Sequence, residues 1–522
     1  MTEPAFDTAH SRTTLPLALL AARARFGGKK QALEDPERTP LTYDRLVLGA
    51  LILGRKLAAD APKGRRIGVL LPSVNGVAVT VFGLWFHGLV PVLLNFTAGV
   101  RNLRSACETA EIDTVVTSRR FIDTAKLDDV VAALGEGRRI VYLEDVRKTI
   151  GTLDKVVGIA RSLFADAVAR AAGTDPDAPA IVLFTSGSEG VPKGVVLSHA
   201  NLIANAQQIW AHAAGLLTSA DVAFNPLPVF HSFGLTAGTL LGLLNGMKVV
   251  MYPSPLHYKQ VPKLIAETGA TLLFATDTFL VGYGRAAEDG ELAGLRLVVT
   301  GAEKVKETTR ALWAPMGTTI LEGYGATECA PVLSCNLPTD NRAGTVGRML
   351  PAIEARLETV EGIHDGGRLI VRGPNVMLGY MLADAPGAVR PPPDGWYDTG
   401  DIVDFDADGF IVIKGRAKRF AKLGGEMVSL AAVETVASDL WPGATHVGVT
   451  LPDSRKGEQI VLVTDKPDAD RQDFLSYARA NGIPELYVPR ALLVVNAIPV
   501  LGSGKIDYAG TTELVKTMRS LI

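Results

Sequence analysis

A segment rich in glycine, serine and threonine surrounds a lysine at residues 185–194 (TSGSEGVPKG). It comes directly after Ala180–Phe184, a short apolar run that is typical of a strand buried on both faces. Glycine allows backbone N–H groups to approach an anion closely, hydroxyl groups add hydrogen-bond donors, and Lys193 adds a positive charge. The segment therefore predicts a loop that binds phosphate, as an enzyme that uses a nucleoside triphosphate requires.

The spacing in this loop differs from that of a P-loop. In a P-loop, Gly-Lys is followed at once by Ser or Thr, whereas Lys193 is followed by Gly194. This difference disfavours kinase-like and GTPase-like functions. Taken alone, a loop rich in Gly and Ser is as often a plain turn, so the interpretation depends on other motifs.

Further motifs follow in the second half of the chain. They are GAE at 301–303, EGYGATE at 322–328, YDTGD at 397–401, GR at 415–416 and GSGK at 502–505. In this order they resemble the motifs of the adenylate-forming superfamily of acyl-CoA synthetases, luciferases and peptide-synthetase adenylation domains, and the resemblance covers essentially the whole chain. Three segments, 225–235, 252–258 and 416–430, are most similar to the acyl-ACP synthetase part of bacterial bifunctional 2-acylglycerophosphoethanolamine acyltransferase/acyl-ACP synthetases. The acyltransferase domain of those proteins has no counterpart here.

The resemblance implies a reaction in which a carboxylate attacks the α-phosphorus of ATP and releases pyrophosphate. The residues that it implies for the β- and γ-phosphates are Thr185, Ser186, Gly187, Ser188, Gly190 and Lys193. Thr327 would contact the α-phosphate, and Glu328 would bind Mg²⁺, which prefers hard oxygen ligands. Lys505 would bridge the carboxylate and the α-phosphate. If the motif context is ignored, the simpler interpretation of Glu328 is an exposed acid in a loop, and that of Lys505 is a solvated surface lysine.

The resemblance also implies the contacts of the nucleoside. The residues placed around the adenine are Gly301, Ala302, Glu303, Tyr324 and Gly325, with Tyr324 stacked on the base. Asp401 would accept the ribose hydroxyls, and Arg416 would approach the same sugar. Without the motifs, Tyr324 is more often a core residue and Asp401 a turn residue.

The segment around His231 indicates the class of acid. The resemblance makes His231 a gate beside the carboxylate site, and Phe230–Phe233 contains no acid that could pair with the amine of an amino acid. Amino-acid substrates are therefore disfavoured, while Phe233, Leu235 and Leu240 suit an apolar pocket.

Two residues depart from the family pattern, one in the phosphate loop and one at the start of the small domain. A cluster of basic residues lies around the second. Glu189 stands where most relatives have Thr, and Arg419 stands where many have a hinge Asp. With Arg416, Lys418 and Lys422, Arg419 forms a basic set that predicts contact with an acidic acyl carrier protein; a solvated linker is the alternative.

We expect an ATP- and Mg²⁺-dependent fatty acid ligase that passes the acyl group to the phosphopantetheine thiol of acyl carrier protein. The alternative is a fatty or aryl acyl-CoA ligase, which uses the same adenylation residues. A noncatalytic acyl- or nucleotide-binding protein is disfavoured because the residues that would carry the chemistry are all present.

Composition limits the partners and the compartment. A net charge of −2 gives no general attraction to nucleic acid, and three cysteines without a CxxC pair favour a reducing cytoplasm without a zinc site. The longest apolar segment, Val77–Leu94, divides better into a buried helix and a strand than into a membrane span. Leu46–Leu57 offers peripheral contact at the inner membrane face, although apolar positions at helical spacing more often face a core.

The elements that must position these residues alternate between strands and helices. The predicted strands are 66–71, 90–94, 114–117 and 140–143, and, after residue 178, 222–224, 247–252, 271–275 and 297–300. Short strands from Gly344 to Ile413 predict a barrel-like subdomain. We therefore expect an α/β fold with two α/β sheet layers and a small barrel-like subdomain in an N-terminal domain (1–415), followed by a small, mobile α+β domain (416–522).

Overall fold

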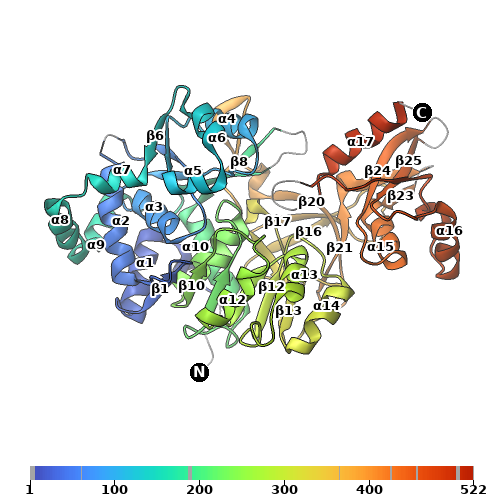
Figure 1. Ribbon diagram of the computed structural model, residues 1–522, viewed down its shortest axis with the longest axis horizontal. Helices are drawn as coiled ribbons and strands as arrows, with labels where there is room; N and C mark the ends of the chain where they lie inside the picture. The colour runs from blue at the N-terminus through green and yellow to red at the C-terminus, as the bar shows by residue number, and fades with distance from the viewer. Residues whose placement is uncertain are drawn as a thin grey trace. The chain divides into compact units, whose positions relative to one another are not determined.

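The computed structural model describes residues 6–59, 61–185, 191–363, 365–423, 426–453, 457–500 and 506–520. Its contacts divide the chain into two compact units (Figure 1). The first unit is Met1–Glu354 with Arg372–Tyr397, and the second is Ala355–Val371 with Asp398–Ile522. The predicted domain boundary between residues 415 and 416 stays a prediction.

A nine-stranded sheet in the first unit contains the strands predicted after residue 178. In spatial order it consists of β15 (Arg348–Met349), β14 (Val332–Cys335), β13 (Thr319–Gly325), β12 (Leu297–Thr300), β11 (Leu272–Ala275), β9 (Val222–Asn225), β10 (Lys248–Met251), β1 (Gln31–Glu34) and β2 (Leu41–Thr42). The run from β13 to β1 is parallel throughout, so the carboxyl ends of these strands lie at one edge of the sheet.

An eight-stranded sheet contains the strands predicted in the first part of the chain. Its order is β19 (Ala385–Arg390), β18 (Gly379–Leu382), β8 (Lys193–Ser198), β7 (Pro179–Thr185), β4 (Val90–Leu93), β3 (Arg66–Val69), β5 (Thr114–Thr117) and β6 (Arg139–Tyr142). The apolar run before the glycine-rich loop is confirmed as the strand β7, and its residues Ala180 to Leu183 are completely buried.

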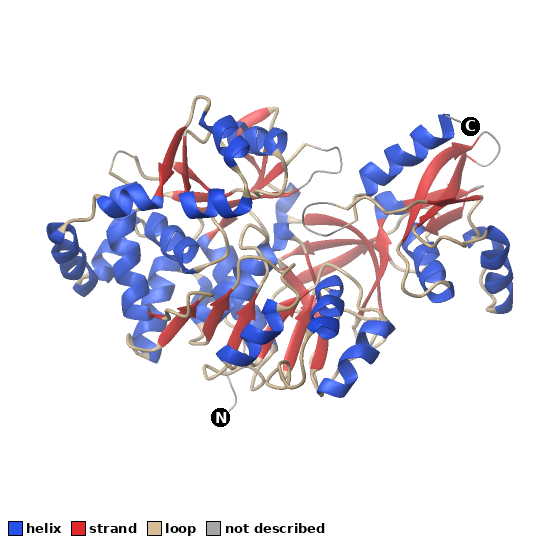
Figure 2. Cartoon of the chain, in the orientation of Figure 1, coloured by secondary structure: helices blue, strands red, loops and turns tan. Residues whose placement is uncertain are grey.

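Helices cover these two sheets (Figure 2). The α-helices of the first unit are α1 (Leu15–Phe26), α2 (Tyr43–Leu57), α3 (Asn75–Trp85), α4 (Val100–Thr109), α5 (Arg119–Ala125), α6 (Asp128–Gly135), α7 (Leu143–Lys148), α8 (Thr152–Leu163), α9 (Ala165–Ala172), α10 (His199–His212), α11 (Leu241–Leu244), α12 (Gln260–Thr268), α13 (Asp277–Ala286) and α14 (Glu307–Trp313). Its other helices are the π-helix η2 (Phe233–Leu240) and the 3₁₀-helices η1 (Thr8–Ser11), η3 (Ala314–Met316), η4 (Thr327–Cys329) and η5 (Pro393–Gly395).

The helix α2 packs closely against α3. A Cβ atom on Gly54 would lie 2.2 Å from the carbonyl oxygen of Gly83, so only glycine permits this crossing. The large side chains of Leu46, Val47 and Leu51 are completely buried. The expectation of peripheral membrane contact through Leu46–Leu57 is therefore wrong, because this apolar stripe faces the core.

The long apolar segment Val77–Leu94 forms α3 and then β4, as predicted. Across the described ranges, we find no helix whose length and apolar content would let it cross a bilayer.

The second unit contains two further sheets. One is β16 (Glu354–Glu358), β17 (Gly367–Arg372), β20 (Tyr397–Phe405) and β21 (Ile411–Arg416), and the other is β23 (Glu426–Ser429), β22 (Phe420–Leu423), β25 (Gly457–Thr464) and β24 (His446–Asp453), with β26 (Ala491–Val494) paired to β25. Its helices are α15 (Leu430–Leu440), α16 (Arg471–Ala480), α17 (Tyr508–Ser520), η6 (Ala417–Arg419) and η7 (Glu485–Tyr487). The short strands predicted from Gly344 to Ile413 are therefore shared among three sheets, because β15 joins the nine-stranded sheet and β18 and β19 extend the eight-stranded one.

Candidate functional site

Two motifs of the sequence lie at the ends of neighbouring parallel strands. Gly301-Ala302-Glu303 follows β12, while Thr327 and Glu328 follow β13 in η4. Because β12 and β13 pair in parallel register, the two motifs lie at the same edge of the nine-stranded sheet. This is the edge at which open parallel sheets bind their ligands.

The turn after β12 presents its backbone to this edge. Ala302 has a φ of 68°, a left-handed conformation that is uncommon for a residue with a Cβ atom. The carboxylate of Glu303 accepts hydrogen bonds from the backbone N–H and the hydroxyl of Thr278, both at 2.9 Å. The Glu303 carboxylate thus already has hydrogen-bond partners within the protein. The backbone of this turn is therefore the part that we expect to contact a ligand.

The end of β13 is shaped by a glycine. A Cβ atom on Gly325 would lie 2.2 Å from the carbonyl oxygen of Pro331, so no other residue fits there. The neighbouring Tyr324 is 8% exposed. Its predicted stacking on adenine stays a prediction, beside the alternative that it is a core residue.

Among the described residues, tyrosine hydroxyls orient the carboxylate of Glu328. The Tyr380 hydroxyl donates a hydrogen bond to Oε1 of Glu328 at 2.6 Å, and the Tyr397 hydroxyl donates in turn to that of Tyr380. Burial and then the Glu328 charge raise the pKa of both phenols well above the usual range, so both remain neutral donors. The carboxylate is therefore oriented while its negative charge stays uncompensated by these partners.

Sequence reasoning missed Tyr380 entirely and used Tyr397 only as part of a motif. Tyr380 lies in β18, and no spacing along the chain connects it with Glu328. Its position beside the carboxylate arises because β18 pairs with β8 and the backbone N–H of Met377 bonds to the carbonyl of Glu328 at 2.8 Å.

The two ends of the glycine-rich loop lie in a hairpin next to this tyrosine. Thr185 and Lys193 are paired residues of the antiparallel strands β7 and β8, and Lys193 Nζ lies 5.6 Å from the ring centroid of Tyr380. The structure thus brings the predicted phosphate-binding lysine to the Glu328 cluster. Of the other predicted residues, Ser186, Gly187, Ser188, Gly190 and Lys505 lie outside the described residues, as does Glu189.

The Thr327 hydroxyl is positioned by a residue that the sequence did not single out. Ser232 Oγ donates to Thr327 Oγ1 at 3.2 Å, and Ser232 is 4% exposed. Ser232 directly follows His231, whose ring lies 4.7 Å from that of Phe230. Thr327 and the predicted gate residue His231 therefore belong to one contact region.

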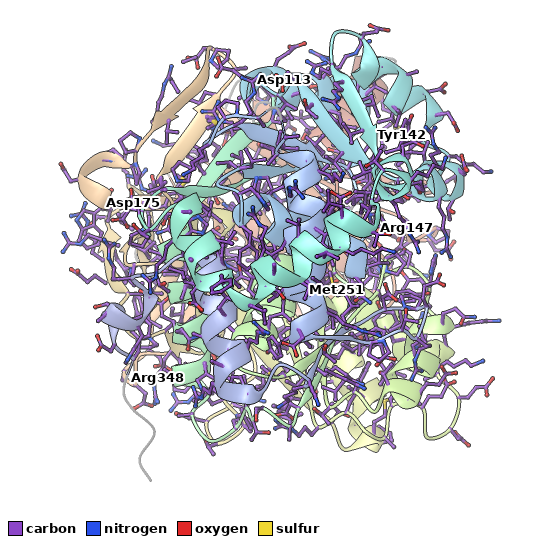
Figure 3. All side chains as sticks on the ribbon, turned by 90° about the vertical axis from the view of Figure 1, so that its left-hand side faces the viewer. Asp113, Tyr142, Arg147, Asp175, Met251 and Arg348 are labelled. Carbon is purple, nitrogen blue, oxygen red and sulfur yellow. The ribbon has the colours of Figure 1, made fainter. Side chains whose placement is uncertain are left out.

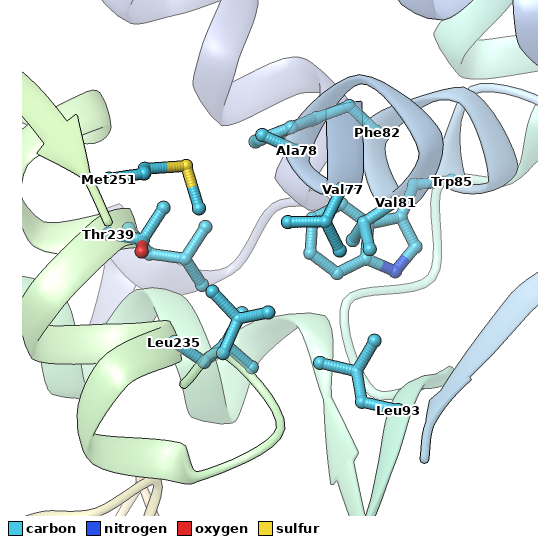
Figure 4. Close-up of a pocket in the computed structure, with 11 residues that line it drawn as sticks. Val77, Ala78, Val81, Phe82, Trp85, Leu93, Leu235, Thr239 and Met251 are labelled. Carbon is cyan, nitrogen blue, oxygen red and sulfur yellow. The ribbon is translucent and has the colours of Figure 1, made fainter. Parts of the chain in front are cut away.

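A small apolar cavity lies beyond this region. Its volume is about 20 Å³, close to that of a single water molecule or methyl group. In Figure 4, Leu235, Thr239 and Met251 face Val77, Val81 and Trp85 across it. The remaining lining residues are Ala78, Phe82, Leu93, Val229 and Leu240.

The cavity walls differ partly from the sequence prediction. Leu235 and Leu240 line the cavity as expected, whereas Phe233 packs edge-on against Phe274 in the neighbouring core, with their centroids 5.9 Å apart. Trp85 is a fixed wall because its Nε1 donates to the carbonyl of Ala180 at 2.7 Å.

In the second unit, Asp401 and Arg416 are paired residues of β20 and β21. Arg416 Nε lies 2.9 Å from Asp401 Oδ1, and its Nη1 donates to the carbonyl of Thr399 at 3.0 Å. Asp401 is 4% exposed, whereas the Arg416 side chain is 59% exposed. The two residues, both predicted to lie at the ribose, are 15 positions apart on neighbouring strands, and their contact with the sugar stays a prediction.

The basic set expected to contact a carrier protein is largely paired with carboxylates. Arg419 bonds to Glu434 at 2.6 Å and lies 3.7 Å over the ring of Tyr508, and its side chain is only 16% exposed. Lys422 lies 3.6 Å from Glu361, and Arg416 binds Asp401. Three of the four basic residues thus have acidic partners in the fold, and the predicted contact with a carrier protein stays a prediction.

Comparisons with known proteins agree with this geometry. Residues 20–381 match the sequence model of a family described as AMP-binding enzyme. A sulfoacetate–CoA ligase from Cupriavidus necator is 31% identical over 94% of this chain and 96% of its own length. A long-chain-fatty-acid–CoA ligase from Escherichia coli O157:H7 is 28% identical over 85% of this chain and 84% of its own.

The fold is also found among solved structures. The anthranilate CoA ligase AuaEII in complex with anthranoyl-AMP superimposes with a TM-score of 0.80 at 19% identity, over 99% of this chain and 100% of the other. These relatives are named as CoA ligases, and the predicted similarity to acyl-ACP synthetases in particular has no support among them.

Proposed function

Because the chain belongs to the family of AMP-binding enzymes, and is therefore an ATP-dependent ligase that forms acyl adenylates, we propose a fatty or other apolar carboxylic acid as its substrate and coenzyme A as its acyl acceptor. The observation that carries the choice of acid is the apolar cavity, whose lining residues Val229 and Leu235 flank the segment of His231 in the sequence. Its walls offer one hydroxyl, that of Thr239, and no charged group, so they suit an aliphatic tail and not a polar one.

The cavity must widen to accept such a tail, because its present volume is about 20 Å³. Met251 and Leu235 are the walls that can move, since both are flexible side chains on one side of it. Trp85, fixed by its hydrogen bond to Ala180, is the wall that would limit the length of the acid.

The residues of the first unit support the adenylation step. A carboxylate oxygen of the acid attacks the α-phosphorus of ATP, and the bond from that phosphorus to the bridging oxygen breaks as pyrophosphate leaves. Lys193 would neutralise charge on the leaving phosphates, and the Thr327 hydroxyl would contact the α-phosphate. In the second unit, the Asp401 carboxylate would accept hydrogen bonds from the ribose hydroxyls. Lys505 would bridge the carboxylate and the α-phosphate.

The donor set around Glu328 fits Mg²⁺. This ion binds through one or two carboxylates together with substrate phosphates, and it does not need a closed cage of side chains. No group of three His, Cys, Asp or Glu side chains in the described part of the chain could hold a metal, which agrees with a site of the open kind. Glu328 would hold the ion, and the ion would neutralise phosphate charge.

The second step transfers the acyl group to a thiol. The sulfur attacks the acyl carbonyl, and AMP leaves with the oxygen that had joined it to the acid. Two observations favour the thiol of coenzyme A over that of a carrier protein: the relatives are named as CoA ligases, and Arg416, Arg419 and Lys422 are already paired with acids.

The test is an incubation with ATP, Mg²⁺, a mixture of fatty and aryl acids, coenzyme A and acyl carrier protein, followed by mass spectrometry of both thiols. We expect AMP, pyrophosphate and fatty acyl-CoA. Acylated carrier protein with unmodified coenzyme A would overturn the proposed acceptor, and aryl or short polar products would overturn the proposed acid.

A further inference from the structure

The helix α8 exposes large apolar side chains to solvent. Leu153 is 74% exposed, Val156 58%, Ile159 52%, Leu163 76% and, at the end of the helix, Phe164 69%. The first four are spaced by three or four residues, which places them along one side of the helix, and Phe164 directly follows Leu163. This side is the outward one, which is the reverse of an ordinary surface helix.

The inward side of α8 is narrow and partly polar. A Cβ atom on Gly158 would lie 2.3 Å from Cγ1 of Ile52, so the glycine lets α8 lie directly on α2. On the same side, Asp154 bonds to Lys56 at 2.9 Å, and Arg161 lies 3.2 Å from the imidazole of His87. The helix is thus attached through small and polar groups, and most of its apolar surface contributes nothing to the core of this chain.

Basic residues outnumber acidic ones in α8 and in the chain on either side of it. The segment 147–170 contains five basic and two acidic residues, and one of those acids, Asp154, is already bound by Arg55 and Lys56. Arg147, Lys155 and Arg170 are exposed, whereas the charge of Lys148 is partly offset by Asp145. The surroundings of the apolar side therefore carry net positive charge. Figure 3 views the face of the first unit on which α8 lies, with Arg147 at its margin.

We propose that the outward side of α8 docks on an anionic lipid bilayer. Leucine, isoleucine and phenylalanine side chains would enter the boundary between headgroups and acyl chains, and the surrounding lysine and arginine residues would lie among the lipid phosphates. A contiguous apolar surface of this kind marks an interaction site. A second copy of the chain is the weaker occupant, because it would bring the same positive charges against one another.

The proposal is independent of the acid and of the thiol that the enzyme uses, because the contact involves neither nucleotide nor substrate. The proposed membrane contact lies on α8, which packs on α2, and not on the buried apolar stripe of α2 itself.

The test is flotation of the purified full-length chain with vesicles of phosphatidylcholine alone and of phosphatidylcholine with 30% phosphatidylglycerol, a composition in the range of anionic membranes. We expect binding to the anionic vesicles. The double variant Ile159→Asp with Leu163→Asp should lower the bound fraction by ~10-fold or more. The matched control is Leu357→Asp with Val494→Asp, which places the same two charges on apolar residues that are 37% and 39% exposed elsewhere, and it should bind as the wild type does.

A second variant separates the charge from the apolar contact. Arg147→Glu with Lys155→Glu should remove the preference for anionic over neutral vesicles while leaving the melting temperature unchanged. The proposal is overturned if the Ile159/Leu163 variant still floats as the wild type does. It is also overturned if wild type ignores both vesicles and sediments instead as a dimer that the same variant dissociates, because α8 would then be a protein interface.

Discussion

Two carboxylates of this protein, the half-buried Glu328 and the buried Asp401, have hydrogen-bond partners of opposite kinds. Glu328 in the first unit accepts a hydrogen bond from a neutral phenol, Tyr380, whereas Asp401 in the second unit forms an ion pair with Arg416. A phenol fixes the direction of a carboxylate without cancelling its charge, and a guanidinium does both. The difference agrees with the proposed roles, a cation at Glu328 and hydroxyl donors at Asp401.

The comparison shows that the partner, and not the residue type, decides the role. A partly buried negative charge without a positive partner costs free energy, and a bound cation would offset that cost. A carboxylate whose charge is offset by a guanidinium attracts a metal ion less, and it can still accept hydrogen bonds from hydroxyl groups. The following substitutions test this difference, beginning with the largest expected effect.

Glu328→Gln keeps the shape of the side chain and removes its charge. We expect the rate of pyrophosphate exchange into ATP to fall by about 10²–10³, the usual scale for losing one preorganised electrostatic contact. Glu307→Gln, an exposed carboxylate of α14, is the matched control and should leave the exchange rate unchanged. Equal rates in the Glu328 variant and wild type would mean that the uncompensated charge has no part in adenylation.

Asp401→Asn should affect recognition of the sugar more than the chemical step. Loss of a charged hydrogen-bond acceptor corresponds to a roughly 10- to 100-fold change in affinity. We therefore expect the variant to lose that much of its preference for ATP over 2′-deoxy-ATP and 3′-deoxy-ATP, measured as the ratio of kcat/KM values. Asp398→Asn, which alters a neighbouring half-exposed carboxylate paired with Arg368, should keep the preference.

Tyr380→Phe removes the donor to Glu328 while leaving the charge in place. One hydrogen bond to a charged group implies a loss of roughly tenfold in kcat/KM for ATP, together with a higher Mg²⁺ requirement. The control is Tyr283→Phe, which deletes a hydroxyl bonded to the Pro255 carbonyl and should lower stability alone. If the Mg²⁺ dependence of the Tyr380 variant matches that of wild type, the phenol does not orient the carboxylate.

The smallest effect concerns alkaline stability. Burial, and then the Glu328 charge, raise the pKa of Tyr397 above its usual value, so the folded state keeps a proton that the unfolded state loses above about pH 10. This contribution to stability is complete below that pH and declines as the pH rises. Tyr397→Phe should reduce the decline in unfolding free energy by about 1 kcal/mol between about pH 10 and 11, and by about 1.4 kcal/mol per pH unit at higher pH. Urea titrations at several pH values measure the slope, and an unchanged slope contradicts the assignment.

Much of the fold followed from local pattern. The strands β3 to β6 and β9 to β12 were predicted within one or two residues, because short apolar runs enclosed by helices on both faces have few other solutions. The strand β13 was not predicted, so the shared position of the motifs after β12 and β13 at one edge of the sheet came only from the structure. The family motifs placed Asp401 and Arg416 at the same sugar, and the ladder of β20 and β21 brings the two residues together, although their contact with a ribose stays a prediction.

Electrostatic partnership did not follow in the same way. The four basic residues near position 419 formed a patch in the sequence, but Glu434 and Glu361 neutralise two of them in the fold. Tyr380 carries no signal in its own segment and becomes important only where β18 joins β8. Likewise, the apolar spacing of α2 and of α8 looks alike along the chain, yet α2 is buried and α8 presents its apolar side to solvent.

The sequence by itself thus determined which residues can carry phosphate chemistry and in which order their strands occur, because both depend on residue type and on separations of a few positions. Tertiary structure alone decided which charges remain available, which tyrosines hold Glu328, and which helix faces outward. These properties depend on groups that are dozens to hundreds of residues apart, and their energies change with burial and with the charge that packs beside them.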